Sequence, residues 1–102
     1  MKKLNQNEWE IVKYALSIEQ VEKIQKEGSL KMDKEDIIKT LEGNIKDIKE
    51  QVLSILEAIE DKDIREKLEK NGNSQIEENE KLIEKLQNDI SNYEAYFIRG
   101  GK

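Results

Sequence analysis

The sequence predicts an all-α protein built on an antiparallel helical hairpin, with a long helix at about 33–71, a second helix at about 75–98 and an additional N-terminal helical segment at about 5–27. Proline is absent and glycine occurs only five times. Apolar residues recur at heptad spacing along most of the chain, and we find no segment with the alternation of apolar and polar residues that is typical of a β-strand. We therefore expect a three-helix, coiled-coil-like bundle.

Composition agrees with that fold class. Charged residues make up 40% of the 102 residues and hydrophobic residues 35%, a balance between that of a globular domain and that of a long-helix or coiled-coil protein. The length suits one domain. We therefore expect a single helical domain over 1–102, with a flexible tail at 99–102.

The N-terminal segment shows one internal boundary. Ser17 and Gln20 have the spacing of a capping box, so a helix break at Ser17 is an open alternative to one continuous helix. Gly28 and Ser29 close the segment. Upstream of Ser17 the apolar residues cover a wide arc, which indicates burial against more than one neighbour: Trp9, Ile11, Val12, Tyr14, Ala15 and Leu16.

The long helix has its own start and stop signals. Asp33 is the expected N-cap and Gly72 the expected residue just past the C-terminal end. Asn44 with Asp47 offers a second capping position, which leaves open a break at Gly43. The apolar stripe that defines the helix keeps heptad spacing: Ile38, Leu41, Ile45, Ile48, Val52, Ile55 and Ile59.

The last helix is expected to begin at a capping box formed by Ser74 and Glu77. The intervening loop, Lys70-Asn71-Gly72-Asn73-Ser74, is short enough to require an antiparallel turn. In that register Ile59 lies near Leu86. The seam of this helix, with Asn79 in its one polar position, consists of Ile76, Ile83, Leu86, Ile90, Tyr93 and Phe97.

The composition disfavours most catalytic and metal chemistry. Histidine and cysteine are both absent, and Asp61-Lys62-Asp63 fails as a calcium loop because Glu66 stands where the loop needs glycine. The glutamates and lysines recur at i,i+4 spacing, as on solvent-exposed helix faces. We therefore expect no enzyme, no catalytic residues, no metal and no cofactor.

Charge and hydropathy limit the partners and the location. The net charge is −5 and no segment is strongly basic, so nucleic-acid binding is disfavoured. No apolar run is long enough for a membrane span, and no apolar leader follows Met1. We therefore expect a cytoplasmic protein that does not enter the membrane.

The aromatic residues and one arginine supply the candidate partner-binding site. Trp, Tyr and Arg dominate the residues that carry binding energy in interfaces. These residues form either an aromatic mini-core, where the first helix crosses the open end of the hairpin, or a binding site. The candidates are Trp9, Tyr14, Tyr93, Tyr96, Phe97 and Arg99.

The favoured function is a non-catalytic protein–protein interaction module, a small regulator, adaptor or inhibitor of the kind that phages and mobile elements encode. It would bind a protein partner or itself as a homodimer. One alternative is a DNA-binding regulator with a helix–turn–helix at 17–42. Another is a small-ligand (nucleotide) binder at an oligomer interface.

Overall fold

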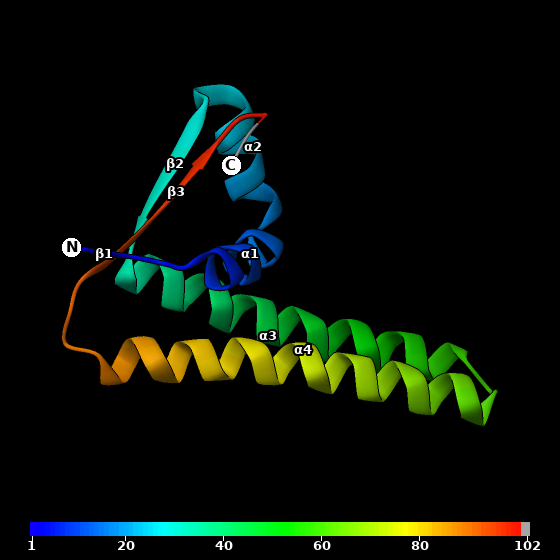
Figure 1. Cartoon of the computed structure of the whole chain (residues 1–102). Helices are drawn as coiled ribbons and strands as arrows, with labels where there is room; N and C mark the ends of the chain where they lie inside the picture. The colour runs from blue at the N-terminus through cyan, green and yellow to red at the C-terminus, as the bar shows by residue number, and fades with distance from the viewer. Residues whose placement is uncertain (101–102) are drawn as a thin grey trace.

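The computed structural model describes residues 1–100 and combines a long helical hairpin with a small mixed sheet (Figure 1). Helices α3 and α4 run side by side, while the shorter helices and the sheet pack on one end of the pair, so the other end of the hairpin projects as an arm. The elements in order are β1 (Lys2–Lys3), α1 (Gln6–Ala15), α2 (Ile18–Glu27), β2 (Ser29–Asp33), α3 (Lys34–Ala58), α4 (Lys62–Asn88) and β3 (Tyr93–Ile98).

The hairpin is confirmed, but its turn lies elsewhere than predicted. Helix α3 ends at Ala58 and α4 begins at Lys62, so the chain reverses at 59–61 and not at 70–74. The Asp61 side chain accepts from two backbone amides of the first turn of α4. The Arg65 guanidinium donates to the carbonyls of Leu56 and Ile59, which satisfies carbonyls left free at the end of α3.

Gly72 and Ser74 therefore lie inside α4, where the sequence predicted a turn and a new helix cap. Gly72 is buried, and a Cβ atom built on it would stand 2.8 Å from Cγ2 of Val52. The glycine thus permits a close approach of the two helices and does not end one of them. Glycine in a helix interior costs about 1 kcal/mol of stability relative to alanine. The close approach of α3 to α4 at Val52 explains why glycine stands at this position.

An amide pair, one member of which is buried, marks the register of the hairpin. The Asn44 side-chain amide donates to Oδ1 of Asn79 at 3.1 Å, and the Asn79 amide donates to the carbonyl of Gln75 at 2.7 Å. Asn79 is only 4% exposed, so a slip of the helices would leave a buried polar group unpaired. The pairing of Ile59 with Leu86 predicted from the sequence is replaced by this register.

The C-terminal segment corrects the all-α prediction. Helix α4 stops at Asn88, and residues 93–98 form the central strand β3 of a sheet with the order β1-β3-β2. Strand β2 is antiparallel to β3, with Leu30 opposite Phe97 and Met32 opposite Ala95. Strand β1 is parallel to β3, with Lys2 opposite Tyr93.

The remaining boundaries follow the capping signals. The break at Ser17 is present, and its capping box with Gln20 starts α2. Gly28 ends α2 with a left-handed φ of 87°, and Asp33 caps α3 as expected. No break occurs at Gly43, since α3 continues through it.

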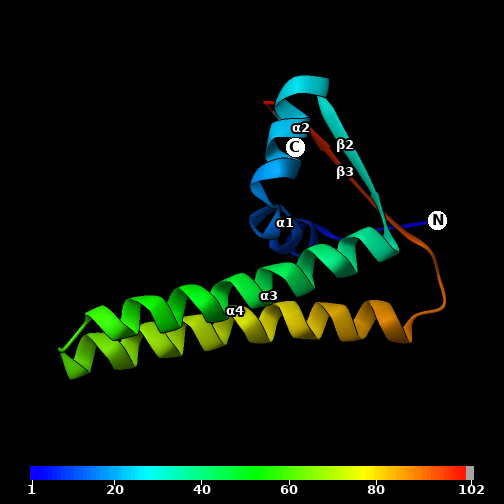
Figure 2. The same ribbon diagram turned by 180° about the vertical axis from the view of Figure 1, so that it is seen from behind.

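The core lies where the sheet, α1 and α2 meet the first half of α3 and the second half of α4 (Figure 2). Its most buried side chains come from four different elements: Val12, Met32, Ile37, Leu41 and Leu86. The projecting arm is thinner, and its apolar residues include exposed ones at Leu53, Ile55 and Ile64. Of the tail predicted at 99–102, residues 101–102 lie outside the described part of the chain. No helix within the described residues combines the length and apolarity that a bilayer crossing requires.

Candidate functional site

The structure brings together Trp9 and Phe97, two of the predicted site residues. Their rings stack with centroids 5.1 Å apart and planes inclined by 23°. The indole nitrogen of Trp9 donates a hydrogen bond of 3.2 Å to the carbonyl of Tyr96 on β3. Helix α1 begins with a capping box between Asn5 and Glu8, immediately before Trp9. Local capping, stacking and the hydrogen bond together fix the indole, which remains only partly buried.

A groove opens beside this aromatic pair, between α1, α2 and the end of β3. Its volume is about 430 Å³. The aliphatic side chains of its lining come from α2, from the link between α1 and α2, and from β3, and two of them, Val21 and Ile98, are each 43% exposed. We call it the Trp9 groove. Its lining residues are Trp9, Lys13, Leu16, Val21, Ile24, Gln25, Phe97, Ile98, Arg99 and Gly100.

Two cations flank the Trp9 groove. The ammonium of Lys13 lies 5.2 Å from the centroid of the Trp9 ring, a cation–π contact. Arg99 donates through Nη1 to the carbonyl of Gln25 at 3.1 Å, and its backbone amide donates to the carbonyl of Gly28 at 2.9 Å. The ion pairs between described residues involve neither Lys13 nor Arg99. Both cations are therefore held at the groove without a carboxylate from the described chain.

The other hollows of the surface have a different character. A hollow between α2, β2 and α3 is lined by both signs of charge, including Lys23 and Lys39 with Glu19 and Asp36. A third hollow beside Tyr14 contains Glu10 and Glu78 and no cation. The Trp9 groove thus differs in joining a fixed aromatic pair to basic side chains alone.

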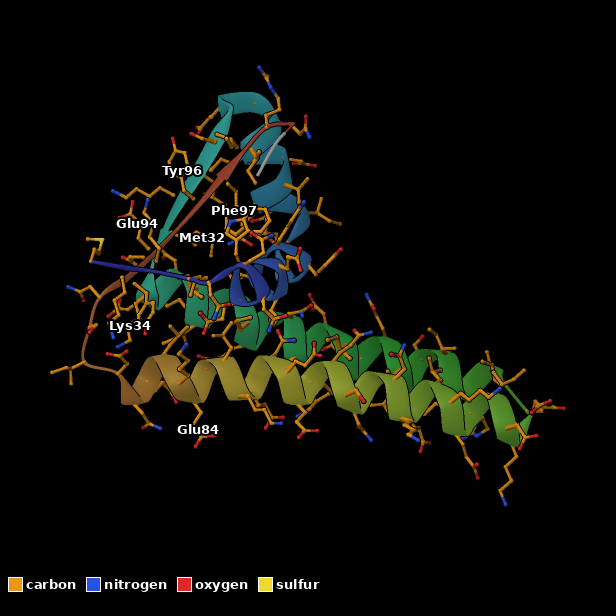
Figure 3. All side chains as sticks on the ribbon, viewed as in Figure 1. Met32, Lys34, Glu84, Glu94, Tyr96 and Phe97 are labelled. Carbon is orange, nitrogen blue, oxygen red and sulfur yellow. The ribbon has the colours of Figure 1, made fainter. Side chains whose placement is uncertain are left out.

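The other three candidate residues lie elsewhere. Tyr96 points to the opposite side of β3 from Phe97, away from the core, and is 53% exposed (Figure 3). Tyr14 is 83% exposed on α1, outside the groove. Tyr93 is 4% exposed in the core. The predicted cluster therefore divides into Trp9, Phe97 and Arg99 at the groove and three tyrosines apart from it.

Tyr93 has a structural role at the far end of β3. Its hydroxyl donates to Oδ2 of Asp89 at 2.6 Å, and this hydrogen bond is the main cause that raises the pKa of Tyr93 to about 12. The same bond, followed by one from the backbone amide of Ser91, holds the pKa of Asp89 well below its ordinary value. Lys2 of β1 also binds Asp89 at 3.2 Å. These contacts join the end of α4 to β1 and β3.

A buried charge also serves the scaffold. Glu8 is 8% exposed, yet one carboxylate oxygen accepts from the amide of Asn5 at 3.0 Å and the other from Lys85 of α4. Both oxygens are thus engaged in capping α1 and holding it on α4. Within the described residues no group of three or more acidic, histidine or cysteine side chains is placed to hold a metal ion.

Sequence reasoning missed Lys13, Leu16, Val21 and Ile24 as parts of the site. The apolar spacing of these residues suits helix faces, and nothing in the sequence links them to Phe97 unless residues 93–98 form a strand. The alternation of Tyr93, Ala95 and Phe97 was the signal that would have placed Phe97 there. Comparison of the chain with models of protein families, with curated proteins and with solved structures finds no match.

Proposed function

We propose that this protein is a non-catalytic protein-binding module and that the Trp9 groove is its docking surface. The supporting observation is the immobilised Trp9–Phe97 pair at the edge of an apolar, partly exposed groove. A rigid aromatic anchor loses little conformational entropy on binding, and tryptophan and arginine are enriched where interfaces carry most of their energy. A regulator, adaptor or inhibitor needs no more than such a surface.

The chemistry of the groove favours binding over catalysis. Its described lining holds no carboxylate, hydroxyl or thiol that could act as a base or a nucleophile. The two groups with shifted pKa values, Asp89 and Tyr93, are hydrogen-bonded to each other and do not line the groove. Their shifts come from a structural contact, so they do not indicate a second, catalytic site.

The helix–turn–helix alternative has little support in the fold. Helices α2 and α3 are not joined by a short turn, because strand β2 lies between them and pairs with β3. Asp33 and Asp36 also stand at the N-terminal end of α3, where a recognition helix would approach DNA. The Trp9 groove therefore supports protein binding better than residues 17–42 support DNA binding.

Matched affinity capture tests the proposal. The wild-type chain, Trp9→Ala and Tyr14→Ala are each used as bait, and captured proteins are compared by quantitative mass spectrometry. We expect at least one partner to be lost with Trp9→Ala and retained with Tyr14→Ala, since Tyr14 is exposed but outside the groove. Equal capture by the wild type and a folded Trp9→Ala variant would contradict the proposal.

Self-association is a second proposed use of the exposed apolar surface. Leu53, Ile55 and Ile64 lie on the arm, and burying them in a homodimer would remove apolar area from water. Light scattering gives the mass directly. A wild-type dimer that becomes monomeric with Leu53→Glu and Ile64→Glu supports homodimerisation through the arm. A wild-type chain that is monomeric at all concentrations contradicts it.

A further inference from the structure

We infer that the Trp9 groove selects an acidic, apolar peptide segment, with a carboxylate held between Lys13 and Arg99 and a neighbouring apolar side chain on the aliphatic wall. This inference rests on the proposed function, since it names the class of partner for the same groove. It begins from the charge balance. The chain has 23 acidic against 18 basic residues, yet the described lining of this groove has two cations and no acid.

The two cations are placed to receive an anion. The contact with the Trp9 ring favours a position of the Lys13 ammonium beside the groove. Arg99 uses one guanidinium nitrogen for the carbonyl of Gln25, which leaves further N–H donors of the same guanidinium. Charge-assisted hydrogen bonds to a carboxylate are about twice as strong as neutral ones, and a partly desolvated groove strengthens them.

The wall of the groove specifies the second feature of the ligand. Val21 and Ile98 are each 43% exposed and stand beside the buried Ile24 and Phe97. An aliphatic or aromatic side chain laid on them would remove apolar area from both partners. An acid next to an apolar residue in one segment meets both conditions at once.

The same geometry disfavours a nucleic-acid ligand. Base recognition in single strands depends on an open aromatic face for stacking. The Trp9 ring already has Phe97 stacked on it and the Lys13 ammonium over it. The net charge of −5 also opposes a polyanion, whereas a single carboxylate needs only the local pair of cations.

A peptide selection with a charge-swap arm tests the inference. A random-peptide phage library is selected on the immobilised wild-type chain, and enriched peptides are synthesised and titrated by calorimetry. We expect an Asp or Glu beside an apolar residue. Affinity should fall about tenfold or more with Lys13→Glu plus Arg99→Glu. The control is Lys49→Glu plus Lys70→Glu, which makes the same change of charge on exposed residues of the arm and should leave affinity unchanged.

The swap makes the result specific. A peptide whose acid is replaced by Lys should bind the wild type poorly and regain affinity for Lys13→Glu plus Arg99→Glu. Circular dichroism checks that every variant is folded.

The outcomes separate the two claims. Peptides without an acid that still require Trp9 would overturn this inference and leave the proposed function standing. Peptides whose affinity is unchanged by Trp9→Ala and by the charge changes would overturn both the inference and the proposed function. A library that yields no groove-dependent peptide would do the same. A single-stranded oligonucleotide that binds the groove more tightly than the peptides, and is lost with the double charge reversal, would replace the peptide with nucleic acid.

Discussion

Trp9 of α1 donates its indole N–H to the backbone carbonyl of Tyr96 on β3, a contact between the two ends of the chain. The bond holds the indole against Phe97, which also lines the groove. Strand β3 is therefore both the centre of the sheet and one wall of the proposed docking surface. Stability of the sheet and affinity for a partner are expected to depend on the same residues.

Trp9→Phe separates the hydrogen bond from the aromatic stack. The phenyl ring keeps most of the stacking area but lacks the N–H donor, so the free energy of unfolding should fall by about 0.5–1.5 kcal/mol. Urea denaturation measures this loss. Tyr14→Phe is the control, because it also alters one polar group of an aromatic residue and Tyr14 is 83% exposed. Equal stability of Trp9→Phe and wild type would argue against the bond to Tyr96.

The Asn44–Asn79 pair predicts coupled mutations. Asn79→Ala should cost about 1–3 kcal/mol, since it leaves the Asn44 amide without its partner and opens a small void. Asn44→Ala should cost a comparable amount, because it leaves the buried Oδ1 of Asn79 without its donor. The double variant should lose less stability than the sum of the two single losses, by about 0.5 kcal/mol or more. Strict additivity in urea titrations would show that the two side chains do not meet.

Gly72 and Gly43 form a matched pair of helix glycines with opposite expectations. Alanine at Gly43 meets no atom within 4 Å, so it should stabilise the protein by up to about 1 kcal/mol. Alanine at Gly72 would meet Val52 Cγ2 at 2.8 Å, and a β-branched side chain in a helix has little rotamer freedom to move away. Gly72→Ala should therefore destabilise by about 1 kcal/mol or more.

Val52→Ala supplies the check on that explanation. Placed on the Gly72→Ala background it removes the clash and should restore part of the lost stability. Thermal melts of the wild type, Gly72→Ala, Val52→Ala and the double variant measure this recovery. If Gly72 instead ended a helix at a turn over 70–74, as its sequence suggested, Val52→Ala would bring no such recovery.

The Asp89–Tyr93 hydrogen bond predicts loss of stability at both extremes of pH. The pKa of Asp89 is lowered in the folded state, so its contribution is present above the unfolded pKa of about 3.9 and is lost as pH falls below it. The pKa of Tyr93 is raised to about 12, so its contribution is present below the unfolded value of about 10 and is lost as pH rises toward 12.

Urea titrations across pH measure both losses. Tyr93→Phe should make the free energy of unfolding depend less on pH on the acid side, because it removes the main cause that lowers the pKa of Asp89. On the alkaline side it should abolish the loss of stability that comes from ionisation of Tyr93. If the free energies of unfolding of the wild type and Tyr93→Phe differed by the same amount at every pH, this linkage would be contradicted.

The presence of a helix pair and the helix boundaries at Ser17, Gly28 and Asp33 were predictable because they rest on local signals. Ser17, Gly28 and Asp33 each satisfy backbone groups within their own turn, and the structure uses all three as expected. The turn of the hairpin was misplaced because Asn71-Gly72-Asn73 has turn composition. A close crossing with Val52, which is a tertiary contact, requires the same glycine.

The strands were missed for a related reason. Tyr93 and Phe97 are four residues apart, a spacing that suits one face of a helix as well as one face of a strand. The alternation of buried Tyr93, Ala95 and Phe97 with the less buried residues between them decides for the strand. The interpretation of Tyr93 and Phe97 as one helix face left this alternation unused. The site was therefore found in part, through Trp9, Phe97 and Arg99, while Lys13 depended on the three-dimensional arrangement.

The most direct test of the account is the indole N–H resonance of Trp9 in a nitrogen–proton correlation spectrum. The chain has a single tryptophan, so this resonance is unambiguous, and its proton lies in the hydrogen bond to Tyr96. On titration with a selected acidic peptide we predict that this resonance shifts together with the amides of Lys13 and Arg99, while Tyr14 and the arm stay unchanged. A saturating titration that moves the arm or Tyr14 and leaves the Trp9 indole in place would contradict the account.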